Sequence, residues 1–301
     1  MRTDAMDSTD PPASPEPARP TFSVIIPTHA RPALLAEAVA SVVAQTREDW
    51  ECLVIDDGSG TDFTPPDRRV RLIRRERTGG PAAARNTGID AATGEVVTFL
   101  DDDDRYTPER LALAARGLEH AEVALCSTRW FDDGTDAAGS DPARSPAGGG
   151  GRRLEGDVAD QILDATTPHL GATAVRADRI VRFDESYAAV EDVEWWLRLA
   201  SANRVATVPE VGCELRRHGG LRANDTDVAG RIRASTKLLA DHDDYFRSHP
   251  SARAFRLARI GLLALSLGDR DEARRACLRS LRARPNGLAV RGLARSVVAR
   301  R

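Results

Sequence analysis

The sequence contains little that would indicate a disulfide framework, a zinc site or a membrane span. Its four cysteines, at positions 52, 126, 213 and 277, lie more than sixty residues apart, which matches neither a disulfide scaffold nor the CxxC pairs of a zinc site. No apolar run reaches the ~18–20 residues of a membrane helix, and residues 1–20 lack the basic start and apolar core of a signal peptide. We therefore expect a cytoplasmic protein in a reducing compartment.

Two phosphate-binding signatures and an overall positive charge are also missing. Neither GxxxxGK[ST] nor GxGxxG follows the first apolar segment, which argues against a P-loop ATPase and a nicotinamide dehydrogenase. The formal net charge is −3, so we expect no nucleic-acid partner. The charge is uneven, however, because residues 251–301 hold 13 Arg and three acidic residues, a balance of +10 that leaves −13 for the rest.

Amino-acid composition and sequence pattern divide the chain into three regions. With 301 residues, 41% hydrophobic and 30% charged, it can form one large or two modest domains with a real core. Residues 1–20 contain five prolines and no apolar cluster, which predicts a disordered tail. We expect the main domain over residues 21–235 and a basic helical region over 236–301. Residues 132–151 are predicted to be a flexible insertion, either a tolerated surface loop or a lid.

Short apolar segments alternate with helical periodicity in the first half of the chain. Residues 22–27, 52–56, 70–74 and 96–100 have the length and composition of buried strands, and helical patterns lie between them. This alternation predicts an α/β fold with a mostly parallel central sheet and flanking helices. Near the C-terminus, two helical segments joined by Leu267-Gly-Asp predict a helical hairpin, which resembles one tetratricopeptide-type repeat.

Acidic residues follow two of the predicted strands. Asp56 and Asp57 come after the second strand, and Asp101 to Asp104 come after the fourth. Parallel sheets present functional groups at the carboxyl ends of their strands, and four adjacent carboxylates repel one another unless a divalent cation or a donor-rich ligand lies there. A solvated acidic turn is the alternative that composition leaves open.

Two predicted helix starts carry further charged residues. Gly79 and Gly80 precede a helix that contains Arg85, so its first amides and this guanidinium suit a diphosphate; an Arg paired with a nearby Asp is the alternative. Glu191 and Asp192 begin a helix that contains Trp195 and Trp196. Acidic residues also favour helix N-termini for purely structural reasons, and we expect at least one of the tryptophans to lie in the core.

Several motifs, in this order and spacing, together resemble the family 2 glycosyltransferases of the GT-A fold. The resemblance runs from about residue 22 to residue 218, roughly two-thirds of the chain. The motifs are FSVIIPT at 22–28, VIDDGS at 54–59, RNTG at 85–88, GEVVTFLDDDD at 94–104, and the Glu191-Asp192 pair with the Trp-Leu-Arg that follows at 196–198.

The resemblance implies a donor site for a nucleotide sugar. In the family, the loop after the first strand, here Pro27 and Thr28, lies against the nucleotide, and an Asp after the second strand binds the base. We assign binding of the nucleotide base to Asp57, with Asp56 as its support, because a carboxylate accepts the imide N–H of a uracil or thymine ring. The donor-binding assignments also include Arg85, Asp101 and Asp102.

The resemblance also implies a metal and a catalytic base. The family's DxD motif falls on residues 101–103, with Asp103 as the expected ligand of Mn²⁺ or Mg²⁺ and His218 as a further ligand. The Asp of the family's ED pair is the general base, here Asp192, and Glu191 is expected to orient an acceptor hydroxyl. His169 either borders the acceptor site or has a structural role.

These implications predict a metal-dependent inverting glycosyltransferase that uses a UDP-sugar or dTDP-sugar. Its expected acceptor is a carbohydrate, a lipid-linked molecule or another hydroxyl compound, in the synthesis of a cell-surface glycan or other glycoconjugate. A GT-A-like protein that binds a nucleotide sugar or a glycan without turnover is the alternative. The basic C-terminal tail further predicts peripheral contact with the inner face of the plasma membrane, unless its Arg residues pair with the acidic body.

Overall fold

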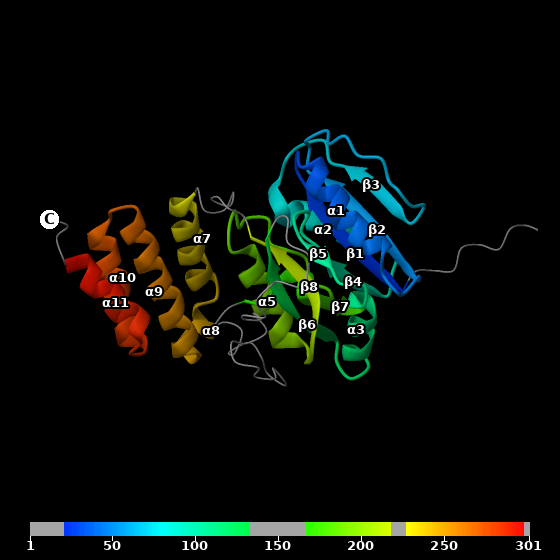
Figure 1. Cartoon of the computed structure of the whole chain (residues 1–301). Coiled ribbons are helices and arrows are strands. Elements are labelled where there is room, and N and C mark those ends of the chain that lie inside the picture. The colour runs from blue at the N-terminus through cyan, green and yellow to red at the C-terminus, as the bar shows by residue number, and fades with distance from the viewer. Residues whose placement is uncertain (1–20, 133–166, 218–226, 298–301) are drawn as a thin grey trace, which may run out of the picture.

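The computed structural model describes residues 21–132, 167–217 and 227–297 as an α/β domain followed by a group of helices (Figure 1). None of the helices in these ranges is both long enough and apolar enough to cross a bilayer. The strands are β1 (Phe22–Thr28), β2 (Trp50–Asp56), β3 (Val70–Arg74), β4 (Val96–Phe99), β5 (Arg105–Tyr106), β6 (Val123–Phe131), β7 (Thr173–Arg176) and β8 (Val205–Arg216). The helices are α1 (Pro32–Val43), α2 (Gly80–Ala91), α3 (Arg110–Gly117), α5 (Glu191–Ala202), α7 (Val228–Asp241), α8 (Asp243–Ser248), α9 (Pro250–Ser266), α10 (Arg270–Ala283) and α11 (Gly287–Val297), with short 3₁₀ turns η2 (Leu170–Ala172) and η3 (Ala177–Arg179).

The strands of the described residues form one mixed sheet in the order β3-β2-β1-β4-β7-β6-β8-β5. The first four strands in this order are parallel, as the alternating pattern predicts. β7 runs antiparallel to both of its neighbours, β4 and β6, while β8 lies parallel to β6. The predicted α/β fold with flanking helices is therefore confirmed, and the antiparallel pairings lie in the second half, where the sequence pattern weakens.

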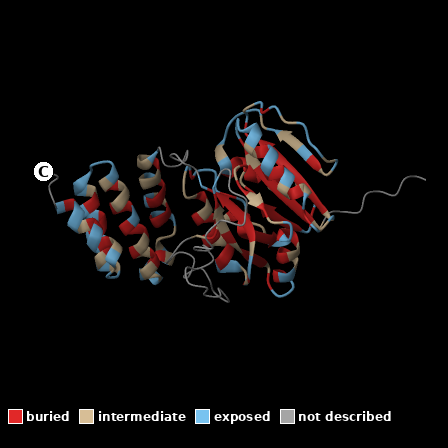
Figure 2. Cartoon of the chain, in the orientation of Figure 1, coloured by how far each residue is buried: buried red, intermediate tan, exposed pale blue. Residues whose placement is uncertain are grey.

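Helices cover both faces of the sheet. Alternate residues of each buried strand point to opposite faces, so Val24 and Ile26 of β1 pack with α1 and α3, while Ile25 packs with α2 and α5. The strands β1, β2 and β4 are buried almost throughout, the edge strand β3 is partly exposed, and each helix turns its buried side inward (Figure 2). Gly88 allows α2 to lie close to β1, because a Cβ there would stand 2.4 Å from Ile25 Cγ2.

The C-terminal helices pack in sequence order beside the sheet domain (Figure 1). α9 and α10 form the predicted hairpin, whose turn contains Gly268 at φ +80°. α11 packs on both of them, and α7 and α9 share a hydrophobic cluster with α5, through Leu238 and Leu257 among others. The helical region is thus joined to the sheet domain by a continuous core.

Candidate functional site

The acidic run lies at the carboxyl end of the parallel strands, where the sequence places it. Thr28 ends β1, Asp56 ends β2, and residues 101–104 follow β4, the neighbour of β1. The Thr28 hydroxyl donates to Asp102 Oδ2 at 2.6 Å. This bond ties the end of β1 to the acidic run.

The four carboxylates differ in their partners. Asp102 is 1% exposed, and its burial raises its pKa to about 6, although the hydrogen bond from Thr28 and the charge of Arg31 act in the opposite direction. Arg31 pairs with Asp102 and also donates to Asp103 Oδ2 at 3.1 Å. Asp104 accepts the backbone N–H of Arg216, at the end of β8, at 2.9 Å.

The acidic run fits a hard divalent cation. Carboxylate oxygens of Asp101, Asp103 and Asp104 lie within 4.8 Å of one another. Oxygen ligands at this density suit Mg²⁺ or Mn²⁺. His218, the other expected ligand, lies outside the described residues.

His169 lies against the acidic run. Its Nε2 is 3.6 Å from Asp101 Oδ2 and 3.5 Å from Asp104 Oδ2, and its Nδ1 accepts the N–H of Gly171 at 3.2 Å. Because Nδ1 is the acceptor, the neutral imidazole carries its proton on Nε2 and directs it at the carboxylates. His169 Nε2 therefore lies within ion-pair distance of two carboxylates of the acidic run.

Arg85 of α2 joins the acidic run to the Glu191-Asp192 pair. Its buried guanidinium donates to Asp101 Oδ1 at 2.9 Å and to Glu191 Oε1 at 3.2 Å. Burial alone would raise the pKa of Asp101, but the charge of Arg85 and its hydrogen bond outweigh burial and hold this pKa below its ordinary value. Two acidic motifs ninety residues apart in the sequence thus share one arginine.

The N-terminus of α2 already has a carboxylate bound to it. Asp57 accepts the amide N–H of Gly79 at 3.1 Å and that of Gly80 at 2.8 Å, and it also pairs with Arg75. The first amides of α2 and Arg85 are both engaged by acidic side chains of the protein. A diphosphate at this helix start would therefore have to displace Asp57.

Asp56 organises the turn after β2. This fully buried carboxylate accepts the amides of Ser59 at 3.1 Å and of Thr61 at 3.0 Å, and these bonds, with the Ser59 hydroxyl, outweigh its burial and lower its pKa. Gly58 has φ +71°, and a Cβ there would stand 2.6 Å from the Thr78 amide nitrogen. Asp56 thus holds the turn that carries Asp57.

The Glu191-Asp192 pair stands at the first turn of α5, after a strained residue. Val190 has φ 57°, a conformation that a β-branched side chain rarely adopts. Burial and the neighbouring charge of Asp192 raise the pKa of Glu191, and Arg85 opposes them. Asp192 is half-buried, and its Oδ1 accepts the N–H of Val193 at 2.8 Å.

Both tryptophans of α5 belong to the core. Trp195 and Trp196 are 0% exposed, and Trp195 stacks on Phe183 with ring centroids 5.1 Å apart. The expectation of a core role for at least one of them is confirmed. These rings fix the helix that presents Glu191 and Asp192.

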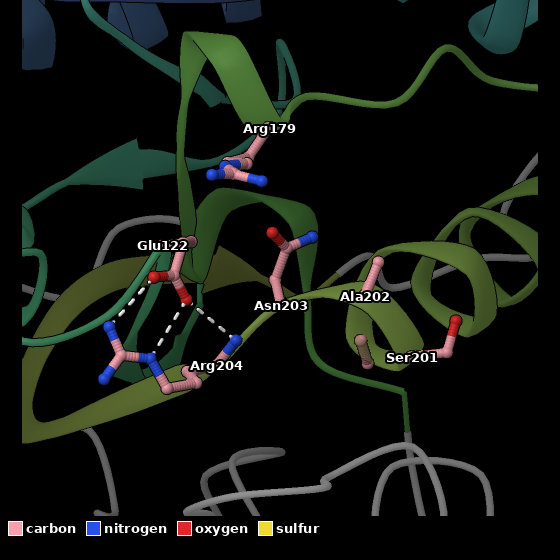
Figure 3. A pocket seen from close by; sticks show the side chains of 7 residues that line it. Glu122, Arg179, Ser201, Ala202, Asn203 and Arg204 are labelled. Carbon is pink, nitrogen blue, oxygen red and sulfur yellow. Dashed lines mark hydrogen bonds and ion pairs between the residues drawn. The ribbon is translucent and has the colours of Figure 1, made fainter.

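A separate pocket of about 450 Å³ lies at the far end of α5 (Figure 3). It is bordered by the ion pair of Arg204 with Glu122, whose closest hydrogen bonds are 2.9 Å long. None of the predicted site residues lines it. Because α5 has 12 residues and rises ~1.5 Å per residue, this pocket is about 16 Å from the Glu191-Asp192 pair.

Two residues near the acidic run have contacts that the sequence analysis did not predict. Arg31 precedes α1, and only the fold brings it to Asp102 and Asp103. His169 stands in a segment without a motif, and its contacts with Asp101 and Asp104 depend on the pairing of β7 with β4. Pro27 pairs in register with Ile55, one residue before the strand ends.

Comparison with known proteins supports the same family. Residues 23–161 match the model of glycosyl transferase family 2. An uncharacterized glycosyltransferase of Rickettsia felis is 28% identical over 208 residues, which cover 66% of this chain and 33% of the relative. Succinoglycan biosynthesis protein ExoW of Rhizobium meliloti is 40% identical over 107 residues, which cover 32% of this chain and 34% of ExoW. The chain therefore spans about a third of the length of these curated relatives.

Solved structures share the fold at low sequence identity. TarS of S. aureus has a TM-score of 0.61 at 19% identity, over 91% of this chain and 53% of TarS. A shorter form of it, residues 1–349 in complex with UDP-GlcNAc, has a TM-score of 0.56 at 17% identity, over 92% of this chain and 88% of that one. The mannosyltransferase PcManGT of Pyrobaculum calidifontis, in complex with GDP-Man and Mn²⁺, has a TM-score of 0.57 at 21% identity, over 95% of this chain and 82% of PcManGT. The family match, the relatives and the shared fold lead to one conclusion: residues 23–161 match glycosyl transferase family 2, and the chain has the GT-A fold.

Proposed function

We propose that the protein transfers a sugar, with inversion, from a nucleotide diphosphate to an acceptor hydroxyl. The observation that carries this proposal is the double ion pair of Arg85, which brings the acidic run and the Glu191-Asp192 pair into one site. The acidic run has carboxylates for a metal that would stabilise the leaving diphosphate. The Glu191-Asp192 pair has a carboxylate for proton transfer. Fold neighbours that bind UDP-GlcNAc and GDP-Man with Mn²⁺ support the reaction class.

Mn²⁺ or Mg²⁺ would be held by the acidic run, with Asp103 as its first ligand and His218 as a further one. A cation bound there supplies charge stabilisation to the diphosphate as it leaves. Asp101 and Asp102 complete the donor side, together with Pro27, Thr28, Asp56, Asp57 and Arg85. Asp102 is held by Thr28 and Arg31, which fixes the acidic run relative to the end of β1.

Asp192 is the proposed base. It takes the proton of the acceptor hydroxyl while that oxygen attacks the anomeric carbon, and the bond from this carbon to the diphosphate oxygen breaks. Because one displacement inverts the carbon, no covalent sugar intermediate is needed. Glu191, held by Arg85, orients the acceptor.

The donor nucleotide is proposed to be UDP or dTDP. A carboxylate at Asp57 accepts the imide N–H of a pyrimidine ring, although here it is bonded to Gly79, Gly80 and Arg75. Base binding by Asp57 therefore requires it to exchange one of these partners. We propose the synthesis of a cell-surface glycan or another glycoconjugate as the process, in keeping with the succinoglycan protein among the relatives.

Thermal unfolding with nucleoside diphosphates and Mn²⁺ tests the donor site without an acceptor. A nucleotide at ~100 times its Kd adds roughly 2.7 kcal/mol of stability, enough to raise the Tm by a few degrees. We expect UDP or dTDP to raise the Tm only with the metal, and Asp103→Asn to abolish this rise. If no nucleotide shifts the wild-type Tm with either metal, the proposed donor site is wrong.

Asp192→Asn separates catalysis from binding. The variant keeps its size and its hydrogen bond to Val193, so we expect the nucleotide-dependent rise in Tm to survive. Transfer, or the slower hydrolysis of the donor sugar by water, should fall by about 10²–10⁴-fold. Turnover at the wild-type rate would exclude Asp192 as the base.

We further propose that the outer face of α11 contacts an anionic membrane surface. Val290 and Val297 are 55% and 64% exposed, and Arg291 and Arg295 are exposed between them. The opposite side of α11, including Gly292, packs on Cys277 of α10. Exposed apolar and basic residues on one helix face suit an anionic lipid surface and would place the protein at the inner face of the plasma membrane.

A further inference from the structure

Arg256 of α9 is a buried arginine that has no ion pair within the described residues. It is 7% exposed, and its only hydrogen bond there runs from Nη2 to the Thr167 hydroxyl at a long 3.4 Å. Its Nε is buried and has no hydrogen-bond partner among the residues that the structure describes. A buried charge without a partner costs several kcal/mol, so this position is unfavourable for folding unless a ligand offsets the cost.

The position of Arg256 is next to the proposed active site. Thr167 stands two residues before His169, whose Nε2 lies 3.6 Å from Asp101 Oδ2 and 3.5 Å from Asp104 Oδ2. The acidic group whose charge acts on Arg256 is Asp192, the proposed base. Burial nevertheless dominates and lowers the pKa of Arg256 to about 10, with Asp192 opposing it and Arg259 adding to it.

The charge of Asp192 also acts on a second arginine of α9. Arg259 lies one turn further along α9, and the charges of Asp192 and of Arg231 in α7 act on its pKa. Its described contact, besides these charges, is the ring of Phe255, 6.0 Å from its guanidinium carbon. Among the described residues neither arginine forms an ion pair, and the charge of Asp192 acts on both.

The unused edge of Arg256 has the geometry of an oxyanion receptor. The Nε–Nη2 edge of a guanidinium donates two parallel hydrogen bonds to two oxygens of a phosphate or a carboxylate. In Arg256 this edge has one nitrogen without a partner and one with a long bond. The Thr167 hydroxyl beside it offers a further donor.

We propose that Arg256, supported by Arg259 and Thr167, binds an anionic group of the acceptor beside the hydroxyl that Asp192 deprotonates. The ligand class is a phosphate or a carboxylate attached to a polyol or a sugar. This inference deepens the proposed function and rests on it. Arg256 lies outside residues 23–161, so the C-terminal helices would supply acceptor specificity to the family domain.

Calorimetric binding of small polyols to the full-length protein, with UDP and Mn²⁺ present, tests the proposal. The probes are glycerol 1-phosphate, glycerate and glycerol, which present a phosphate, a carboxylate and no charge. We expect one anionic probe to bind, glycerol not to bind, and Arg256→Gln to weaken the anionic probe by roughly ten- to a hundredfold. The probe that binds more tightly identifies the anion.

Arg253→Gln is the matched control, because Arg253 lies one turn earlier on α9 and pairs with Asp243 instead. It should bind the probes as the wild type does. The Tm of Arg256→Gln without ligand should equal or exceed that of the wild type, since the substitution removes an unpaired buried charge. A Tm several degrees lower would indicate a structural role and overturn the proposal.

The remaining outcomes are also decisive. Equal binding of glycerol and its phosphate, no binding of any probe while UDP and Mn²⁺ bind, or unchanged affinity in Arg256→Gln would each overturn the anion site alone. Failure of the wild type to bind UDP and dTDP with either metal would overturn the proposed function and this inference together.

Discussion

At the scale of single residues, Arg85 stabilises two carboxylates that come from different parts of the chain. Its side chain is 6% exposed, and those of Glu191 and Asp101 are 9% and 29% exposed. Removing one member of a buried ion pair leaves its partners without compensation. The stability of the site therefore depends on this guanidinium.

Arg85→Gln should lower the free energy of unfolding by about 3 kcal/mol. Urea denaturation at neutral pH in EDTA measures this loss without interference from bound cations. The double variant Arg85→Gln with Glu191→Gln should regain at least about 1 kcal/mol, because it removes a buried carboxylate together with its partner. Strictly additive losses would show that Arg85 does not compensate Glu191.

At the same scale, the sequence predicts the residue types of the site better than their partners. Asp101 to Asp104 and Glu191-Asp192 stand where the motifs place them. The sequence is compatible with either a diphosphate or a nearby Asp as the partner of Arg85, and the structure shows Asp101 and Glu191. A side chain's partners depend on distances across the fold, which no local pattern contains.

At the scale of elements, α5 is held at its start by Arg85 and in its first turns by Glu194. The Glu194 side chain is 4% exposed and contacts Arg198 of its own helix and His242 at the end of α7, 3.3 Å away. Burial would raise the pKa of Glu194, but the hydrogen bonds from His242 and Arg198 outweigh it and lower the pKa to about 2. Glu194 thereby connects the sheet domain to the C-terminal helices.

Glu194 should make stability depend on acidic pH. Its pKa in the folded state lies below the ordinary 4.5, so its contribution is complete above pH 4.5 and disappears as the pH falls toward 2. The pKa difference corresponds to roughly 3 kcal/mol. Denaturation of the wild type and Glu194→Gln at several pH values should show this difference in the free energy of unfolding near pH 6. The difference should shrink progressively as the pH is lowered.

Glu122→Gln is the control for Glu194→Gln. The pKa of Glu122 is also about 2, because Arg204 donates to it, but this pair lies at the surface. Because solvent screens surface ion pairs, we expect Glu122→Gln to lower the free energy of unfolding by less than about 1 kcal/mol. Equal losses in the two variants would contradict the role of burial.

At the scale of the whole molecule, the uneven charge of the sequence corresponds to separate regions of the structure. The basic C-terminal region forms helices at one end of the molecule, away from the parallel half of the sheet (Figure 1). Several of its arginines pair locally with acidic residues of the same helices, such as Arg275 with Glu272. The arginines of the outer face of α11, Arg291 and Arg295, remain exposed.

Sedimentation with vesicles that contain anionic lipid tests the membrane proposal on the full chain. Each Arg near an anionic surface contributes about 1 kcal/mol, so Arg291→Glu with Arg295→Glu should weaken binding at least tenfold. Arg179→Glu with Arg247→Glu, which changes the charge equally at two other exposed sites, should bind as the wild type does. Equal sedimentation of both double variants would reject α11 as the contact.

The sequence by itself determined the parallel half of the sheet, the positions of the acidic motifs and the C-terminal hairpin, because these depend on local periodicity and on motifs within short segments. Only the tertiary structure decided that β7 runs antiparallel to β4 and so brings His169 to the acidic run. It also decided that the charge of Asp192 acts on Arg256, more than sixty residues later in the chain. Such contacts arise from packing between distant segments, whose register and orientation are fixed by the whole core.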